Sequence, residues 1–432
     1  MDTNTIAIIL MVGLFFGLMV LRLGVGLAMG LATIATMIYL KMPISVVFQG
    51  MVSGTKSYTF MAVPFFIFMG EIMSAGGISD RIINFAKALV GWIRGGGAYV
   101  NVVASMFFGG ISGSATGDTA ALGPLEIKLM TSQGYDKEYS TSLTMASSVQ
   151  GMLIPPSHNM VVYSVAAGSV SVGALLMAGL IPGIVLGVAL MIYSYFYAIK
   201  HQIPKCGKFN AKELIKTTIT AMWGLSTIIV ILLGVNGGVM TATESAAIAA
   251  AWALVVSVVI YKDMKIKQYY AVATKAIKTL SMIFLLIAAS NSFGWLVAFL
   301  KIPAMITEFI LSITTNKYII LMMINILLIF LGMVMSMSSI IIILTPILVP
   351  ILTYLDVNLV HFGVIMILNL GIGLITPPVG GVLYIGSAIS GIKVNRLIVS
   401  TLPLYAVMFI VLLLLTYVPA ISLWFPQLVG AM

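Results

Sequence analysis

The sequence contains few charged residues and a single cysteine. Only 8% of its 432 residues are Asp, Glu, Lys or Arg, whereas 61% are hydrophobic. Soluble domains carry about 25% charged residues, so this composition excludes an ordinary soluble protein. Apolar runs that approach the membrane thickness recur along the chain, which predicts an all-α polytopic membrane protein. Cys206 has no second cysteine to pair with, so an intrachain disulfide is excluded.

Motifs that carry catalysis are also missing. The sequence has no His-Glu-x-x-His zinc motif, no phosphate-binding P-loop, and no Gly-x-Ser-x-Gly elbow between a strand and a helix. We therefore do not expect an enzyme, and the energy for any transport must come from an ion gradient or from another subunit. His158 has no Cys or acidic residue nearby at ligand spacing, so we expect no metal beyond a coupling cation.

The excess of positive charge follows the pattern of a membrane protein. The net charge is +10, but Lys and Arg cluster in short links between apolar runs. The densest basic run lies in 200–216, and a second basic link follows at 262–267. Cytoplasmic loops are enriched in Lys and Arg, so we assign both links to the cytoplasm and expect no nucleic acid partner.

Two short polar stretches interrupt otherwise apolar sequence, and a pair of prolines follows each one. The polar stretches cover 109–119 and 336–339, and the proline pairs are Pro155-Pro156 and Pro377-Pro378. Each pair begins 31 positions after an earlier proline, Pro124 or Pro346 (155 − 124 and 377 − 346). The equal spacing predicts an internal repeat. Paired interruptions in corresponding halves are also the best sequence indication of a transporter's binding site.

Each polar stretch predicts a hairpin, and each proline pair predicts a broken helix. The arms beside the first stretch have only about 12–15 residues, too few to span comfortably, so we expect a re-entrant hairpin. Tandem prolines remove two backbone donors and push the preceding residue out of the α region. The predicted elements are hairpins at about 98–130 and 335–356 and broken helices at about 140–169 and 361–390.

The remaining apolar runs predict conventional spans joined by short links. An amphipathic segment at about 79–94 is expected to lie at the membrane interface. A run at about 279–300 carries Ser290-Asn291-Ser292, which is another possible break. No linker or low-complexity stretch marks a boundary, so we expect one integral unit, residues 1–432, with two interleaved halves. The other predicted spans cover about 5–21, 24–40, 171–199, 217–235, 241–261, 318–334 and 397–424, and about 41–59 is a polar stretch.

Asp118 is the strongest single indication of a binding site. An ionisable group at membrane depth is costly and usually faces a partner or a cavity. The hydroxyl groups of Ser112, Ser114, Thr116 and Thr119 are close to it in sequence. Together with free carbonyls at a helix break, these oxygens would suit a small hard cation. The alternative is that Asp118 only caps the second arm of the hairpin, and the two roles are compatible.

The breaks at the proline pairs can serve anions and cations. The N-terminus of a half-helix favours an anion, whereas the carbonyls before the break favour a cation. Ser157, His158 and Asn159 follow the first break directly, and Thr376 precedes the second proline pair. Gly380, just after that pair, allows close approach of the backbone. The alternative is that the prolines kink the helices for packing alone.

Glu244 lies at the start of a predicted span. Thr241 and Glu244 have the spacing of a capping box, in which each side chain binds the backbone N–H of the other. We therefore assign Glu244 to a structural or gating role, together with Pro155, Pro156, Pro377 and Pro378.

Five blocks of sequence together resemble the large membrane (M) subunit of tripartite ATP-independent periplasmic (TRAP) transporters. Each block is modest on its own, but their order and spacing are similar to that family from about residue 5 to about residue 425. The blocks are Ser112-Gly-Ser-Ala-Thr-Gly-Asp118-Thr-Ala-Ala, Ile154-Pro-Pro-Ser157, Thr241-Ala-Thr-Glu244-Ser-Ala-Ala, Leu344-Thr-Pro-Ile-Leu-Val-Pro350 and Gly371-Ile-Gly-Leu-Ile-Thr-Pro-Pro-Val-Gly380.

The resemblance implies a sodium-coupled importer of organic anions in the bacterial inner membrane, an inverted-repeat transporter that works by an elevator motion. A periplasmic solute-binding protein would deliver the substrate, and a small four-helix membrane subunit would brace the large one. Because this chain begins directly in the large-subunit region, we expect the small subunit to be a separate polypeptide. Residues 98–170 and 335–390 would form the two halves of the transport domain, and residues 1–60, 171–261 and 397–425 mainly the scaffold.

The resemblance also implies site residues. Sodium sites at hairpin tips and helix breaks correspond here to Ser112, Ser114, Asp118, Ser336, Ser338 and Thr376. Substrate is expected near the first break and between the hairpins, at Ser157, His158, Asn159, Asn369 and Gly380. Many relatives carry an acidic residue where this chain has Ser336, and Ile-Pro-Pro-Ser-Ile-Pro where this chain has Ser157-His158-Asn159. The cation and substrate contacts at these positions therefore differ from those of such relatives.

A stand-alone ion-coupled carrier or exchanger of the same architecture, without a binding protein, is the alternative. Transport by this chain reconstituted alone would favour it. A membrane enzyme or a channel would need a nucleophile with its base or a continuous polar pore lining, and the sequence contains neither.

Overall fold

The computed structural model describes residues 3–21, 23–56, 61–168, 170–205, 209–236, 239–264 and 266–432. Within these ranges every regular element is a helix, and one isolated β-bridge joins Arg94 to Lys205. Seven of the described helices are long and apolar enough to cross a membrane, or eight if one bent pair counts as a single span. The prediction of an all-α polytopic membrane protein is therefore confirmed. Cys206 lies outside the described residues.

Two runs of five helices follow the same plan. In each run a hairpin is followed by a helix, a break at the proline pair, a short helix and a long helix. The first run consists of α6 (Gly96–Ser112), α7 (Ala115–Ser132), α8 (Lys137–Gln150), α9 (His158–Ala167) and α10 (Val172–Lys200). The second run consists of α15 (Lys317–Gly332), α16 (Met337–Tyr354), α17 (Leu359–Ile375), α18 (Gly381–Ser390) and α19 (Val394–Tyr417).

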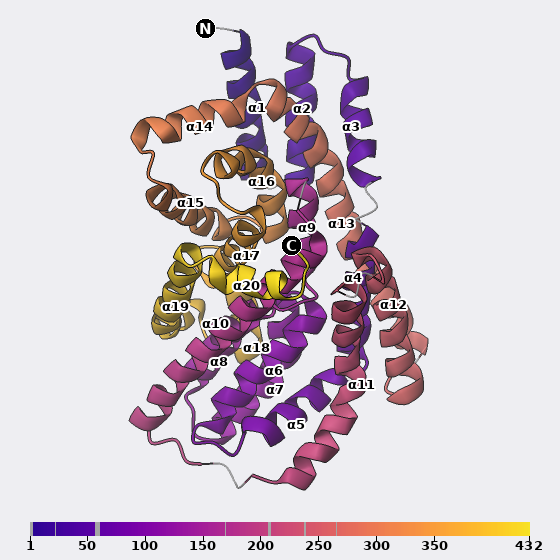
Figure 1. Cartoon of the computed structure of the whole chain (residues 1–432), viewed down its shortest axis with the longest axis vertical. Coiled ribbons are helices and arrows are strands. Elements are labelled where there is room, and N and C mark those ends of the chain that lie inside the picture. The colour runs from indigo at the N-terminus through magenta and orange to yellow at the C-terminus, as the bar shows by residue number, and fades with distance from the viewer. Residues whose placement is uncertain are drawn as a thin grey trace.

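The two runs also share one register. The residues that precede α7 and α16 are Ser114 and Ser336, which are 222 positions apart (336 − 114). Pro155 and Pro377 have the same offset (377 − 155). The structure therefore contains the repeated plan that the proline spacing predicts. Figure 1 shows the α6–α7 hairpin in the lower body of the protein and α15 and α16 in the upper body, with α9 and α17 between them.

Three boundaries differ from those predicted. The hairpin predicted at 335–356 is wrong, because this segment holds the single helix α16. The first arm of the second hairpin is α15, which precedes this segment and whose uninterrupted apolar sequence resembles that of a separate span. The possible break at 290–292 is wrong, since α13 (Ile266–Phe299) is continuous there. The hydroxyl of Ser290 donates to the backbone carbonyl of Ile287, and that of Ser292 donates to the carbonyl of Val47. Both serines are therefore satisfied without a break in the helix. Part of the predicted polar stretch forms α3 (Ser45–Thr55).

The hairpins pack crosswise on the broken helices. α7 lies against α18, and α16 lies against α9, so each hairpin contacts the short helix of the other run. Glycines let the first arm of each hairpin approach the break of its own run. A Cβ at Gly109 would overlap the backbone of Gly151, and Gly332 and Gly373 are similarly close. These contacts hold the hairpin tips beside the breaks.

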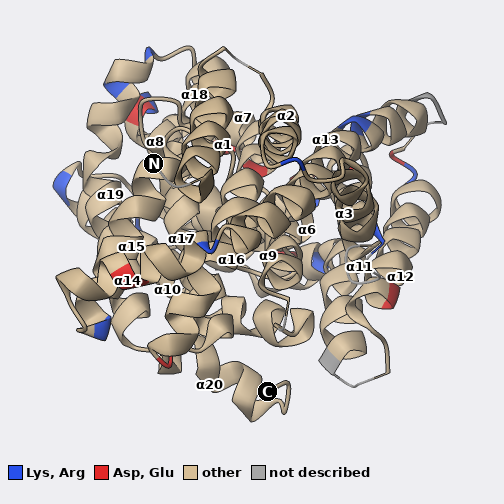
Figure 2. Cartoon of the chain, turned by 90° about the horizontal axis from the view of Figure 1, so that it is seen from above, with Lys and Arg blue, Asp and Glu red and all other residues tan. Residues whose placement is uncertain are grey.

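The remaining helices form a second group beside the repeated ones. α13 packs against α3 and α2 (Val25–Tyr39), and α12 (Ala242–Val255) packs against α4 (Ala62–Ala75). The last members are α1 (Thr3–Val20), α5 (Ile78–Val90), α11 (Ala211–Asn236) and α14 (Ile302–Ile313), whereas α20 (Ala420–Leu428) packs against α10 and α17 of the repeated runs. A Glu71–Lys275 ion pair of 2.8 Å joins α4 to α13. Figure 2 shows that charged residues are sparse over most of the helices.

The amphipathic segment predicted at 79–94 corresponds to α5. It turns away from α4 by 74°, and its position at the membrane interface stays a prediction. Arg81 fixes its position through an ion pair of 2.6 Å with Asp263 and by stacking 3.8 Å above the ring of Tyr261.

Candidate functional site

The first hairpin turns at residues 112–114. Gly113 has a φ of +59°, in the left-handed region that favours glycine. Ser114 caps α7, since its hydroxyl accepts a hydrogen bond of 3.3 Å from the Gly117 N–H. The alternative in which Asp118 caps this helix is therefore wrong, and its carboxyl group needs another explanation.

This tip lies against the first helix break. The break separates α8 from α9 and contains Pro155 and Pro156. A Cβ at Gly113 would lie 3.0 Å from the carbonyl oxygen of Pro156 and 3.2 Å from Cα of Ser157. The whole break is buried. The fold therefore brings together the first polar stretch and the first proline pair.

Polar groups at the N-terminus of α9 lack partners. Ser157 is fully buried, and its hydroxyl has no hydrogen-bond partner among the described residues. It occupies the N-cap position of α9 without capping the helix. The first N–H groups of a helix need acceptors and carry a partial positive charge, so this end of α9 suits an anionic group. Asn159 is buried in the same first turn, and His158 is half-buried.

The second hairpin reaches the same helix end. Its tip is at Ser336, which precedes α16 and lies within hydrogen-bond distance of the Ser339 hydroxyl. Ser338 donates a hydrogen bond of 3.2 Å to Oδ1 of Asn159. The N-terminus of α9 therefore lies between the two tips, and a residue predicted for cations meets one predicted for substrate.

The second break is more open than the first. Thr376 follows α17 directly and donates a hydrogen bond of 2.7 Å back into that helix. Pro378 and Val379 are exposed, in contrast to the buried first break. The Val379 N–H donates to the Met333 carbonyl at 3.1 Å, which ties this break to the second hairpin. Gly380 precedes α18 with a φ of +29°.

Asp118 lies deeper in the hairpin than the tip hydroxyls. Its side chain is buried, and neither of its oxygens has a hydrogen-bond partner among the described residues. It faces Ser105 of α6 and Glu126 of α7. Sequence reasoning missed Glu126, although Asp118, Leu122 and Glu126 recur every four residues and so share one helix face. Carboxylate and hydroxyl oxygens without partners fit a hard cation.

Two predicted residues lie away from the tips. Asn369 is buried about two turns before the end of α17, where it donates to Oδ1 of Asn325 at 2.9 Å and to the carbonyl of the same residue at 3.1 Å. Glu244 forms a capping box with Thr241, accepting its backbone N–H at 2.7 Å. The predicted capping role of Glu244 is therefore confirmed.

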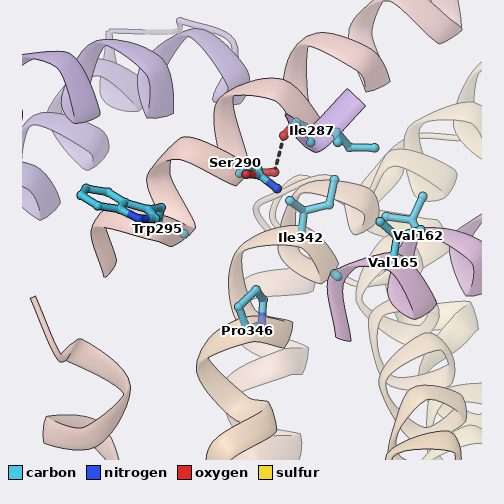
Figure 3. A pocket seen from close by; sticks show the side chains of 11 residues that line it. Val162, Val165, Ile287, Ser290, Trp295, Ile342 and Pro346 are labelled. Atoms are coloured by element: carbon cyan, nitrogen blue, oxygen red, sulfur yellow. Dashed lines mark hydrogen bonds between the residues drawn. The ribbon is translucent and has the colours of Figure 1, made fainter. Parts of the chain in front are cut away.

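A pocket of about 310 Å³ lies between α13 on one side and α9 and α16 on the other. Figure 3 shows Ser290 of α13 near Ile342 of α16, with Val162 of α9 alongside and Trp295 at the other end of the lining. Its lining is largely apolar and includes none of the predicted site residues. The pocket therefore marks a loosely packed contact between the two helix groups, separate from the hairpin tips.

Several proteins of a known family are similar to this chain in sequence. The family described as "Tripartite ATP-independent periplasmic transporter, DctM component" matches residues 12–421. The isethionate TRAP transporter permease protein DctMQ of Oleidesulfovibrio alaskensis is 38% identical over 415 residues, covering 96% of this chain and 65% of that protein. The sialic acid TRAP transporter large permease protein SiaM of Vibrio cholerae is 37% identical over 380 residues, covering 88% of this chain and 89% of that protein.

Solved structures share the fold at much lower sequence identity. The crystal structure of the Alcanivorax borkumensis YdaH transporter is similar with a TM-score of 0.64 and 12% identity, covering 88% of each chain. This similarity concerns the fold alone, whereas the family match spans nearly the whole sequence. The chain therefore belongs to the DctM family of large permease subunits of TRAP transporters, which are multi-pass transporters of the bacterial inner membrane and not enzymes.

Proposed function

We propose that this permease imports a small organic anion by sodium-coupled, binding-protein-dependent transport. One observation carries the proposal: the uncapped N-terminus of α9, with the unpartnered Ser157 hydroxyl, lies between the tips of both hairpins. An anionic group placed there would accept hydrogen bonds from the helix end and from Ser157. Asn159, His158 and, across the second break, Gly380 are its further neighbours in this proposal.

Sodium would bind at the hairpin tips and breaks, through Ser112, Ser114, Asp118, Ser336, Ser338 and Thr376. These side chains offer only oxygen atoms, which suit a hard cation. Ser338 is hydrogen-bonded to Asn159. A cation that orders the second tip would therefore also orient Asn159, which is proposed to contact the substrate. A ligand shifts a conformational equilibrium only through its different affinities for the two states, so sodium must favour the substrate-competent form.

The movement in this proposal is an elevator motion of a transport domain, residues 98–170 and 335–390, against a scaffold formed mainly by residues 1–60, 171–261 and 397–425. The two hairpins would be re-entrant and the two runs inverted relative to each other, consistent with their positions in the lower and upper body in Figure 1. The crosswise packing of α7 on α18 and of α16 on α9 would let the hairpins and breaks move as one unit. The pocket between α13 and α16 leaves room at the surface along which that unit would slide.

The relatives narrow the class of substrate. The names of two of them identify isethionate, a sulfonate, and sialic acid, a carboxylate, as their substrates. A helix N-terminus and a serine hydroxyl recognise either group, so we propose a carboxylate or a sulfonate here. The partners would be a periplasmic solute-binding protein and the small four-helix membrane subunit.

The proposal is tested by uptake of radiolabelled organic acids into proteoliposomes. The chain is reconstituted with the small subunit, with and without the binding protein, under an inward sodium gradient. We expect uptake only when sodium and the binding protein are both present. Uptake without the binding protein would contradict the need for it, and equal uptake under a proton gradient in sodium-free medium would contradict sodium coupling.

A further inference from the structure

Two acidic side chains are buried together inside the first hairpin. Asp118 is 1% exposed and Glu126 is 0% exposed, and they are close enough to interact electrostatically. No described Lys, Arg or His forms an ion pair with either of them. Placing an unpaired carboxylate at membrane depth is costly, so something must compensate these two groups.

The polar side chains around the pair do not compensate it. Ser105 donates a long hydrogen bond of 3.4 Å to Oε1 of Glu126 and also lies 3.1 Å from the Ser147 hydroxyl. Ser147 in turn donates to Asn101 at 2.8 Å, and Asn101 donates to a threonine of α8. Both oxygens of Asp118 and Oε2 of Glu126 have no hydrogen-bond partner among the described residues.

Either a proton or a bound cation can compensate the pair. A proton supplies a single O–H donor, whereas three carboxyl oxygens of the pair lack a partner among the described residues. A cation bound between the carboxyl groups would use the same oxygens as ligands and would offset their charge. The donor set contains only oxygen, which favours a hard cation over a transition metal.

The repeat shows that the fold does not require these acids. With the 222-residue offset, Asp118 corresponds to Ile340 (340 − 118) and Glu126 to Leu348 (348 − 126). Ile340 and Leu348 are buried in α16, as their counterparts are in α7. At these two positions the same arrangement of helices therefore buries apolar side chains in the second run and a pair of carboxyl groups in the first. A purely structural role for the pair does not explain this difference.

We propose that Asp118, Glu126 and Ser105 form a buried site for one sodium ion inside the α6–α7 hairpin, with Glu126 as an essential ligand. The proposal extends the sodium coupling proposed above, because it adds an interior site below the tip and does not depend on the substrate. Asp118, which is also proposed as a ligand at the tip, would connect the tip hydroxyls with this interior site. Sodium bound there would hold α7 against α6 and keep the hairpin in one conformation.

The test measures sodium binding without transport. The full-length chain is purified in detergent micelles, and its thermal unfolding and its binding of ²²Na⁺ are measured in sodium, potassium and choline chloride at equal ionic strength. For the wild type we expect a higher melting temperature in sodium than in potassium or choline, because a ligand that binds only the folded state stabilises it.

The decisive variants replace the acids by their counterparts in the repeat. Glu126→Leu should bind one sodium ion fewer per chain and lose the part of the sodium-specific melting shift that comes from this site. Asp118→Ile/Glu126→Leu should lose at least as much, because Asp118 is also proposed as a ligand at the tip. Glu126→Gln keeps the shape of the side chain and provides the same test if the apolar variants fail to fold. Glu138→Gln, which changes a more exposed acid at the start of α8, is the control and should behave like the wild type.

Two results would overturn the proposal. One is an unchanged number of bound sodium ions in Glu126→Gln and Glu126→Leu. The other is a wild-type melting temperature that responds to pH but not to sodium, which would mean that protons alone neutralise the pair. Sodium-driven uptake by the wild type combined with either result would leave the proposed function standing, so the two failures can be told apart.

Discussion

The Ser338 hydroxyl donates a hydrogen bond of 3.2 Å to Oδ1 of Asn159, although 179 positions separate the two residues. Ser338 lies in the first turn of α16, and Asn159 lies in the first turn of α9. Two helices therefore begin at the same place, and this side-chain contact joins them. The contact directly links a residue proposed for sodium to one proposed for substrate.

Removing this hydrogen bond should weaken the coupling between sodium and substrate. A neutral hydrogen bond contributes about 0.5–1.5 kcal/mol, so Ser338→Ala should raise the sodium concentration for half-maximal uptake by about twofold to tenfold. Asn159→Ala should have a similar effect, and the double variant should be little worse than either single one, since both remove one bond. The measurement is the sodium dependence of uptake in proteoliposomes.

A matched control exists for this experiment. Ser312 is an exposed serine whose hydroxyl donates to a carbonyl of its own helix, α14, at 2.7 Å. Ser312→Ala should leave the sodium dependence unchanged. Fully additive effects of Ser338→Ala and Asn159→Ala would show that the two residues act independently.

Thr376→Ala should impair transport while leaving insertion and folding intact. The Thr376 hydroxyl donates to the carbonyl four residues earlier, at 2.7 Å, and its oxygen is proposed as a cation ligand at the break. Thr353 makes the same contact in α16 at 2.9 Å but is exposed away from the breaks. Uptake and melting temperature should both be normal in Thr353→Ala, whereas only the melting temperature should be near normal in Thr376→Ala. Normal uptake in both variants would contradict a sodium role for Thr376.

The glycine crossing at the first break should not tolerate a side chain. A Cβ at Gly151 would overlap the backbone of Gly109, which cannot move aside as a flexible side chain can. Overpacking a close contact costs about 1–3 kcal/mol, so Gly151→Ala should lower the melting temperature and the folded yield. Gly17→Ala in α1, with nothing within 4 Å of the added carbon, is the control. Equal stability of the two variants would mean that the hairpin can shift away from the break.

The sequence predicted the breaks better than the helix boundaries. Proline pairs and glycines act through the backbone, so their spacing located both breaks and the first hairpin. Apolar runs carry less information, because hydrophobicity does not distinguish a separate span from one arm of a hairpin. For this reason α15 was assigned to a span and the second hairpin was placed too late in the sequence.

Glu126 was missed for a different reason. It lies two positions before Lys128 in a stretch of mixed polarity, which is typical of an exposed helix face. Its burial depends on the packing of α7 against α6 and α8, the helices on either side of it in the chain, and this packing is not visible in the local polarity pattern. Two signals could have indicated it: Glu126 lies two steps of four residues after Asp118, on the same helix face, and the counterparts of both acids in the repeat are apolar.

Filling the pocket between α13 and α16 should slow transport without unfolding the protein. Gly294 lines this pocket and has nothing within 4 Å of an added Cβ, so Gly294→Trp can place its ring in the space without displacing the backbone. If the repeated helices slide past α13 during transport, the ring would obstruct that movement. We expect uptake to fall severalfold while the melting temperature stays within a few degrees of the wild type.

The control for this variant is Gly17→Trp, which adds the same side chain at an exposed position of α1. It should transport normally, since Gly17 does not line the pocket. Wild-type uptake by Gly294→Trp with an unchanged melting temperature would mean that the surface between α13 and α16 does not slide, and the elevator motion would then need another interface. Reduced uptake in both variants would point to a general effect of tryptophan on insertion rather than to an obstructed movement.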